Sequence, residues 1–187
     1  LYAHWITVNY REAYNIFACN GILFNHESPL RGETFVTKKI ISALCKISLS
    51  GTGNLYLGNL YSKRDWGHAK DYVLAMWKML QRKNPKDYVI ASGRQYSVKY
   101  FVNLICDILK MKIYWKGKGI NEKAYWNGKV IISIDKKYFR PTEVDSLLGD
   151  SSKARKELRW KPLYNIRSLA QDMVAEEFKK IHVNKKK

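Results

Sequence analysis

The sequence predicts an α/β protein. Short apolar segments rich in β-branched residues alternate along the chain with amphipathic helical segments, a pattern typical of α/β architecture. A second observation qualifies this fold class. No glycine-rich phosphate loop follows any predicted strand, although a complete dinucleotide-binding fold has one near its start.

The first third of the chain is predicted to contain a helix, a buried strand and a second helix. Residues 1–10 have apolar groups at helical spacing but no capping residue, so we expect this helix to begin upstream of Leu1. Residues 16–24 are largely apolar and predict a buried strand that ends at a polar loop. The next helix, 34–47, has an apolar face formed by Val36, Ile40, Leu44 and Ile47.

Strands and helices continue to alternate in the rest of the chain. Strands are predicted at 55–57, 88–91, 113–115 and 130–134, the last two separated by a long polar loop. One helix follows Trp66-Gly67, ends at Asn84-Pro85 and is expected to bury Val73, Met76, Trp77 and Leu80. Three more helices are expected: one capped by Ser97 that buries Val98, Phe101, Val102 and Ile105, one capped by Asp150 that runs to Leu158, and one over 168–181.

Charge and cysteine usage limit the class of protein. The net charge of +18 would attract any polyanion, so a basic nucleic-acid-binding domain is an alternative reading. The lysines are nevertheless spread along the chain, with one dense cluster at 185–187, and no zinc-finger, RRM or KH signature accompanies them, so nucleic acid is not the expected partner. Three widely separated cysteines indicate neither a disulfide framework nor a metal site, and no apolar run reaches membrane-spanning length. We therefore expect a cytoplasmic protein without a metal.

Three polar clusters are candidates for a binding site. The first, 25–32, follows a predicted buried strand, where ligands bind in open α/β sheets; its structural alternative is a polar turn. In the second, 58–68, Arg64 and Asp65 suit either a diphosphate clamp or an ion pair at a helix start. In the third, 139–145, Arg140 and Glu143 could offer a guanidinium to phosphate and a carboxylate to ribose hydroxyls, or simply form a charged loop.

Together the clusters resemble one family. Asn25-His-Glu-Ser-Pro29, Lys63-Arg-Asp-Trp-Gly-His-Ala69 and Arg140-Pro-Thr-Glu-Val-Asp145 are similar to motifs of the GDP-mannose 4,6-dehydratases, which are extended short-chain dehydrogenases/reductases. The resemblance extends over essentially the whole chain. It implies the C-terminal part of an NAD(P)-binding Rossmann-like fold without the glycine-rich strands, plus a smaller substrate-binding domain. Residues 1–32 would be the remnant of the Rossmann-like domain, and 33–187 mainly the GDP-sugar-binding domain, with returns to the Rossmann sheet.

The resemblance also implies roles for individual residues. His26 and Arg31 match NADP contacts of the family. The residues that match contacts to the GDP-mannose substrate are Asn25, Lys39, Arg64, Arg140 and Glu143. The family oxidises the sugar at C4 with NADP, removes water across C5–C6 and returns the hydride to C6, giving GDP-4-keto-6-deoxymannose on the route to GDP-fucose. A homo-oligomer is expected for the full-length protein.

The catalytic residues of the family have no counterpart in this chain. In the family a helical Tyr-x-x-x-Lys pair supplies the base, and Leu1 corresponds to the residue just after that lysine. Tyr114 to Lys118 and Tyr125 to Lys129 match the spacing, but both contain glycine in strand-end or turn sequence, so a helical pair is not expected. We therefore assign no catalytic residue and expect this chain alone to be inactive. A non-catalytic GDP-sugar-binding or regulatory module is the alternative.

Four positions depart from the family's usual pattern. Tyr61 stands where aspartate is common, Leu30 where a basic residue is common, Ser151 where proline usually starts a helix, and Arg159 where glycine usually precedes the tryptophan. Tyr61 lies three residues before Arg64, a residue that matches a substrate contact of the family.

Overall fold

The structure, a computed structural model, describes residues 1–139 and 142–184. The chain divides into two compact units that interleave along the sequence. Unit 1 comprises 1–26, 65–95 and 148–166, and unit 2 comprises 27–64, 96–147 and 167–187. The assignment of 1–32 to a Rossmann-like domain and of 33–187 mainly to a GDP-sugar-binding domain stays a prediction.

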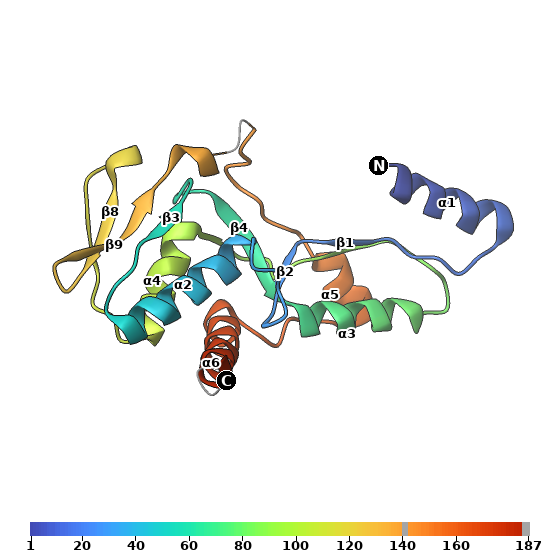
Figure 1. The fold of residues 1–187 in the computed structure, drawn as a ribbon. Helices are drawn as coiled ribbons and strands as arrows, with labels where there is room; N and C mark the ends of the chain where they lie inside the picture. The colour runs from blue at the N-terminus through green and yellow to red at the C-terminus, as the bar shows by residue number, and fades with distance from the viewer. Residues whose placement is uncertain (140–141, 185–187) are drawn as a thin grey trace. The chain divides into compact units, whose positions relative to one another are not determined.

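Unit 1 contains a pair of parallel strands with helices beside it. Strand β1 (Gly21–Leu23) pairs with β5 (Tyr88–Ile90), and α3 (Ala69–Leu80) and α5 (Ser152–Leu158) lie next to them (Figure 1). Burial of apolar side chains between these elements stabilises the unit. The core consists of Tyr72, Ala75, Met79, Tyr88, Ile90, Ala154, Leu158 and Trp160.

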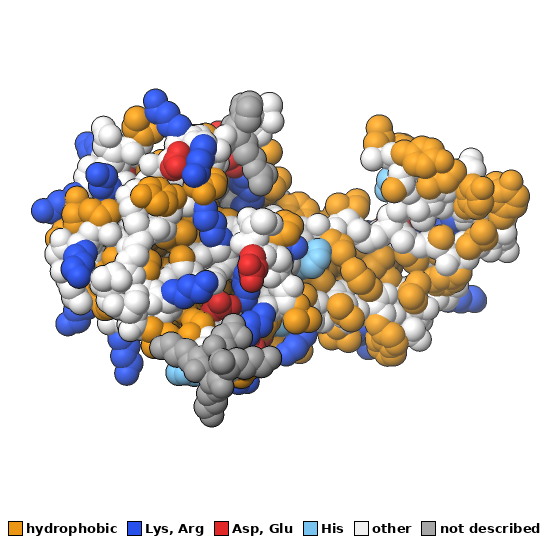
Figure 2. Space-filling model, in the orientation of Figure 1, with side chains coloured by type: hydrophobic (Ala, Val, Ile, Leu, Met, Phe, Trp, Pro, Cys, Tyr) orange, Lys and Arg blue, Asp and Glu red, His pale blue; other side chains and the backbone are white. Residues whose placement is uncertain are grey.

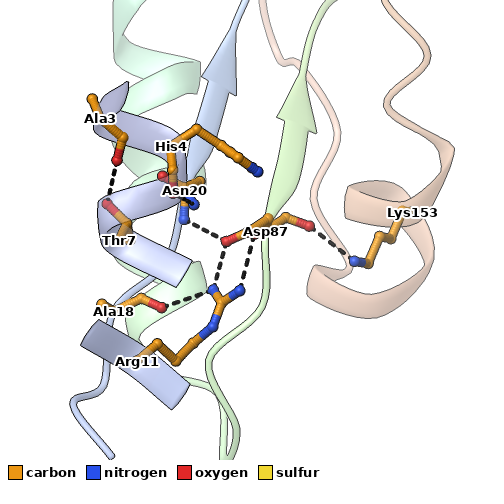
Figure 3. Close-up of polar contacts among 8 residues, drawn as sticks. All are labelled: Ala3, His4, Thr7, Arg11, Ala18, Asn20, Asp87 and Lys153. Carbon is orange, nitrogen blue, oxygen red and sulfur yellow. Dashed lines mark hydrogen bonds and ion pairs between the residues drawn. The ribbon is translucent and has the colours of Figure 1, made fainter. Parts of the chain in front are cut away.

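Helix α1 (Tyr2–Tyr14) is connected to the strands of unit 1 by one ion pair. Arg11 donates from Nη1 and Nη2 to the two carboxylate oxygens of Asp87, at 2.7 and 3.1 Å (Figure 3). The backbone N–H of Asn20 also donates to Asp87, at 2.7 Å. No residue of α1 is buried, and hydrophobic side chains gather on the surface over this helix (Figure 2). The polar contacts at Asp87 therefore help to hold a helix whose apolar side chains are at best partly buried.

Unit 2 is built on a four-stranded mixed sheet. Its order is β3 (Leu55–Leu57), β9 (Lys129–Ile134), β8 (Lys123–Trp126) and β7 (Tyr114–Lys116), and only the β3–β9 pairing is parallel. Helices α2 (Val36–Ser50) and α4 (Val98–Ile108) pack together, and α2 contacts β3. Helix α6 (Ile166–Asn184) is joined to α2 by a buried ion pair, in which Lys38 Nζ lies 2.6 Å from Glu177 Oε2.

Strands β2 (Asn25–Glu27), β4 (Lys63–His68) and β6 (Gln95–Ser97) form a third sheet, in the order β2-β4-β6. The division of the chain into its two units falls within each of these three strands. No described helix is both long and apolar enough to cross a bilayer. The part of the chain that the structure describes also holds no cluster of three metal-ligating side chains.

Most predicted elements are confirmed, and two helix faces are as expected. Helix α2 buries Ile40, Leu44 and Ile47, and α4 buries Val98, Phe101, Val102 and Ile105. The Ser97 hydroxyl accepts a hydrogen bond from the N–H of Tyr100, and the Asp150 carboxylate accepts from the N–H of Ser152. The Ser97 cap is therefore confirmed, whereas α5 has Ser151 as its N-cap residue and Asp150 lies one position before it.

Three expectations were wrong. The strand predicted over 16–24 is shorter in the structure, where β1 spans only Gly21–Leu23, and Ile16 and Phe17 are exposed. The polar loop before 130–134 contains a strand that we did not predict, β8, which pairs between β7 and β9. Helix α3 exposes the face that we expected to be buried: Val73 is 61% exposed and Trp77 58%. Its buried face carries Tyr72, Ala75 and Met79 instead, because these residues pack against β5 and Trp160.

Candidate functional site

Arg64 and Glu143, far apart in the sequence, form an ion pair in unit 2. Arg64 Nη2 lies 2.6 Å from Glu143 Oε1, and both side chains are mostly buried. Arg64 Nη1 also donates to the carbonyl oxygens of Lys63 and Val144, at 2.9 and 2.5 Å. The planar guanidinium is thus held at the start of β4 by the segment that follows residue 142. A fixed guanidinium beside a carboxylate can bind a diphosphate and a neighbouring hydroxyl group.

Asp65, the neighbour of Arg64, has a different role. Its carboxylate is fully buried in unit 1 and accepts hydrogen bonds from the backbone N–H groups of Ser92, Gly93 and Gly149, at 2.9, 3.0 and 3.3 Å. Side chains alternate between the two faces of a strand, so consecutive residues of β4 point in opposite directions. Neither predicted reading of an Arg64–Asp65 pair applies to Asp65, which instead joins the backbone at Ser92-Gly93 to that at Gly149.

Lys39, a predicted contact to the GDP-sugar, lies on the first turns of α2. Its Nζ donates to the carbonyl oxygen of Tyr56 at 2.6 Å and lies 3.5 Å from the ring centroid of Tyr138. Tyr56 belongs to β3, and Tyr138 ends the short 3-10 helix η2 (Lys136–Tyr138). Both tyrosines are substantially exposed. The predicted ammonium group is therefore placed against two aromatic residues that the sequence did not single out.

Arg31, a predicted NADP contact, belongs to a compact cluster in the loop before α2. Its guanidinium stacks on Phe35, 3.4 Å from the ring centroid, and Nε lies 3.2 Å from Glu27 Oε2. The same carboxylate accepts from the Thr37 hydroxyl at 2.5 Å. Arg31 Nε is buried but makes no hydrogen bond, because the ion-pair distance to Glu27 is not matched by hydrogen-bond geometry. Nε therefore faces the Glu27 carboxylate, and the partly exposed remainder of the guanidinium can bind an anionic group such as a cofactor phosphate.

His26 and Asn25 lie on β2, in unit 1, and are half-buried. His26 Nδ1 is 2.9 Å from the carbonyl oxygen of Phe24. The centroid of its imidazole ring is 5.1 Å from the centroid of the Tyr72 phenol ring. Because a carbonyl oxygen only accepts, Nδ1 carries the hydrogen and Nε2 is left as an acceptor in the neutral ring. Arg140, the remaining predicted contact, lies outside the described residues.

The two Tyr-x-x-x-Lys matches are not helical. Tyr114 lies on β7, and Tyr125 lies on β8, opposite Tyr114 in the antiparallel pairing. The rings of these two tyrosines stack on each other, with centroids 5.3 Å apart. Neither match therefore has the one-face helical geometry of a tyrosine whose pKa is lowered by a lysine at i+4.

Tyr61 forms a polar cluster with Lys99 and Glu122. The Tyr61 hydroxyl donates to Glu122 Oε2 at 2.8 Å, and Lys99 Nζ donates to Oε1 at 2.5 Å. Lys99 Nζ also lies 4.8 Å from the ring of Trp115. The residue that replaces the usual aspartate thus provides a donor to a buried carboxylate, which an aspartate could not do.

The other departures from the family pattern are explained one by one. Ser151 donates from its hydroxyl to the carbonyl oxygen of Ala91 at 2.9 Å, joining the start of α5 to the end of β5. Arg159 ends α5 in the left-handed conformation, with φ of 47°, a geometry that glycine adopts at lower cost. Leu30 is 89% exposed, and nothing in the structure explains it.

Comparison with known proteins gives a consistent family. A family model described as GDP-mannose 4,6 dehydratase matches residues 1–173. The GDP-mannose 4,6 dehydratase of Drosophila melanogaster is 53% identical over 186 residues, covering 98% of this chain and 47% of the relative. The GDP-mannose 4,6-dehydratase of Sinorhizobium fredii is 55% identical over 179 residues, covering 95% of this chain and 51% of the relative. The chain thus spans about half the length of the curated relatives it matches.

Solved structures show the same fold at low sequence identity. RMD from Pseudomonas aeruginosa, complexed with NADPH, aligns with a TM-score of 0.75 at 15% identity, covering 94% of this chain and 52% of that chain. A dTDP-glucose 4,6-dehydratase from Bacillus anthracis, in complex with NAD, aligns with a TM-score of 0.74 at 18% identity, covering 96% and 50%. The predicted Rossmann-like fold of the extended short-chain dehydrogenases/reductases is confirmed.

Proposed function

Because this chain belongs to the GDP-mannose 4,6-dehydratase family, we propose that it forms the GDP-sugar-binding half of an enzyme that converts GDP-mannose to GDP-4-keto-6-deoxymannose, towards GDP-fucose. The observation that carries the proposal is the Arg64–Glu143 ion pair, at 2.6 Å. It joins two predicted ligand residues that lie 79 positions apart in the sequence.

Each proposed substrate contact suits one part of a GDP-sugar. The Arg64 guanidinium offers paired N–H donors to the diphosphate, and its three bonds to Glu143, Val144 and Lys63 keep it oriented before the ligand arrives. The Glu143 carboxylate accepts from ribose hydroxyl groups. Lys39 adds a positive charge, Asn25 an amide that can donate and accept, and Arg140 a second guanidinium.

NADP is the proposed cofactor, and its nicotinamide ring supplies the acceptor for the hydride removed from the sugar. Arg31 would bind a phosphate through its guanidinium, which the Phe35 ring and the Glu27 carboxylate hold in place. His26 would accept a hydrogen bond at Nε2, since Nδ1 faces the carbonyl oxygen of Phe24. The related structures complexed with NADPH and NAD support a nicotinamide cofactor.

This chain alone is proposed to bind the substrate without turning it over. Dehydration begins with removal of the proton from the C4 hydroxyl group, which needs a positioned base. The two tyrosines at the right spacing from a lysine lie on paired strands and stack on each other instead. We further propose a cytoplasmic location and, for the full-length protein, a homo-oligomer.

The test is a turnover assay on two proteins, the 187-residue chain and the natural gene product, each given GDP-mannose and NADP. Mass spectrometry of the nucleotide sugar detects the loss of one water. We expect the chain to bind GDP-mannose without product, and a gene product about twice as long, the size of a complete extended reductase, to form the 4-keto sugar. Dehydration by the chain itself would overturn the assignment of the base to residues outside it. A gene product that binds GDP-mannose and never dehydrates it would favour the non-catalytic module.

A further inference from the structure

Tyr138 presents an exposed aromatic ring directly beneath a lysine of the proposed substrate site. The ring is 41% exposed, and Lys39 Nζ lies 3.5 Å from its centroid. Lys137 Nζ lies 4.9 Å from the same centroid. Two ammonium groups therefore lie beside one aromatic ring at the surface of unit 2.

The position of this ring is fixed by the backbone around it. The N–H of Asp135 donates to the carbonyl oxygen of Leu57 at 2.9 Å, which joins η2 to the end of β3. The Asp135 carboxylate then accepts from the N–H of Lys137 at 3.0 Å and caps the short helix. At Gly58 a Cβ atom would lie 2.5 Å from the carbonyl oxygen of Tyr138, so the close approach of these segments requires glycine. The ring is thus a preorganised surface and not the tip of a loose loop.

The charge of Lys39 is available to a ligand. Among the residues that the structure describes, the partners of its Nζ are the carbonyl oxygen of Tyr56 and the ring of Tyr138, and neither is an anion. A cation–π contact at an exposed site is weak, whereas a nucleobase stacked on an aromatic side chain is held more firmly. A ligand with both an aromatic base and a phosphate would therefore replace the Lys39–Tyr138 contact with two better ones.

We propose that Tyr138 is the stacking surface for the nucleobase of the bound nucleotide, and that Lys39 leaves the ring for a phosphate when the nucleotide binds. The inference rests on the proposed function, because it deepens the same GDP-sugar site. It assigns Tyr138 to the recognition of a nucleoside diphosphate and gives Lys39 two positions, one on the ring and one on the ligand.

The first test compares GDP affinity among three variants of the natural gene product by calorimetry. Tyr138→Ala removes the stacking surface and is expected to weaken GDP binding by about tenfold to a hundredfold. Tyr138→Phe keeps the ring and is expected to bind like the unchanged protein. Tyr114→Ala is the matched control, since Tyr114 is 45% exposed and Lys116 Nζ lies 5.5 Å from its ring centroid. Inorganic pyrophosphate, which has no base, should bind equally to all variants.

A second test follows Lys39 without removing the ring. Lysines are reductively methylated with ¹³C, and the Lys39 signal is assigned by its loss in Lys39→Arg. In the free protein we expect this signal to be shifted upfield by the Tyr138 ring, and to return towards the other lysines when GDP is added.

The outcomes separate this inference from the proposed function. If GDP does not bind the unchanged protein, both are overturned. If GDP binds the unchanged protein but Tyr138→Ala binds it equally well, Tyr138 is not the stacking surface and the proposed function stands. The same conclusion follows if the Lys39 signal stays shifted upfield when GDP is added. If Tyr138→Ala does not fold, the Lys39 signal alone decides between these results.

Discussion

Glu143 Oε1 lies 2.6 Å from Nη2 of Arg64, although the two residues are 79 positions apart. The pair joins the start of β4 to the segment after residue 142, where the N–H of Lys63 also donates to the carbonyl oxygen of Asp145 at 2.8 Å. Both side chains are mostly buried, and the cost of removing two charges from water offsets much of what such a pair contributes to stability. A preoriented guanidinium and carboxylate instead favour the binding of a ligand that carries both phosphate and hydroxyl groups.

Replacing Arg64 by lysine should weaken GDP binding while the protein stays folded. Lysine keeps the charge but loses the planar fork that bonds a diphosphate at two points and the carbonyl oxygen of Val144. We expect the dissociation constant for GDP to rise about tenfold, since bidentate charge-assisted hydrogen bonds are the stronger kind. Calorimetric titration measures this, with Arg167→Lys as the control at an exposed ion pair with Asp107. Equal losses in both variants would mean that overall charge, and not the Arg64 geometry, determines the affinity.

Asp65→Asn should destabilise the protein markedly. The buried carboxylate accepts from three backbone N–H groups, and an amide would bring its own N–H donors towards them. Leaving buried donors unsatisfied costs about 1–3 kcal/mol each, so we expect the free energy of unfolding to fall by roughly 2–4 kcal/mol. Urea denaturation provides the measurement, and Asp107→Asn, at an exposed position, should change it by less than about 0.5 kcal/mol. A mild effect of Asp65→Asn would show that these backbone groups find water instead.

Arg159→Gly should stabilise the protein. Arg159 has φ of 47°, and glycine takes this left-handed conformation without the steric cost that a side chain adds. The bond from Lys78 Nζ to the carbonyl oxygen of Arg159, at 2.9 Å, involves only the backbone and would be kept. We expect a gain of about 0.5–1 kcal/mol in the free energy of unfolding. Lys156→Gly, inside α5, is the opposite control and should cost about 1 kcal/mol. A loss of stability in Arg159→Gly would mean that the arginine side chain makes a compensating contact.

The Arg11–Asp87 pair should make stability depend on acid pH. The hydrogen bond from Arg11 holds the pKa of Asp87 well below its usual range, against the opposing effect of partial burial, and the N–H of Asn20 lowers this pKa further. Because the folded-state pKa is depressed, the stabilisation is complete above the unfolded-state pKa, roughly 3.9, and is lost as the pH falls below it.

Asp87→Asn tests this pH dependence. The variant should be less stable than the unchanged protein at neutral pH, and the difference should shrink as the pH is lowered below about 4. Thermal unfolding followed by circular dichroism across this range measures the effect. A difference that does not change with pH would contradict the assignment of the stabilisation to the ionised carboxylate.

The buried face of a helix could be predicted from the sequence where one side of the helix is apolar and the other polar. In α2 and α4 the apolar residues fall on one face, so Ile40 and Phe101 could be assigned to the core. Helix α3 has apolar residues on both sides, and the side that is buried is determined by Trp160, which follows 80 residues later in the chain. Strand β8 was missed because its four residues lie between Asn121-Glu122 and Asn127-Gly128, so the segment resembles a polar loop until the neighbouring strands are known.

The candidate site was only partly predictable for a related reason. The resemblance in motifs drew attention to Arg64 and Glu143, but their contact depends on how β4 meets the segment after residue 142. Tyr138 gave no signal in the sequence, since its significance comes from Lys39, which reaches its ring from α2. Asp65 was grouped with Arg64 because the two are neighbours, although alternation along a strand sends neighbouring side chains to opposite faces.

The most direct test of the central claim is the equilibrium binding of GDP-mannose to this 187-residue chain, measured by calorimetry at low and at physiological salt. We expect saturable binding of one ligand per chain that GDP displaces and that Arg64→Lys weakens. The absence of saturable binding, together with an affinity for nucleic acid that falls steeply with salt, would contradict a GDP-sugar site and favour a basic nucleic-acid-binding domain.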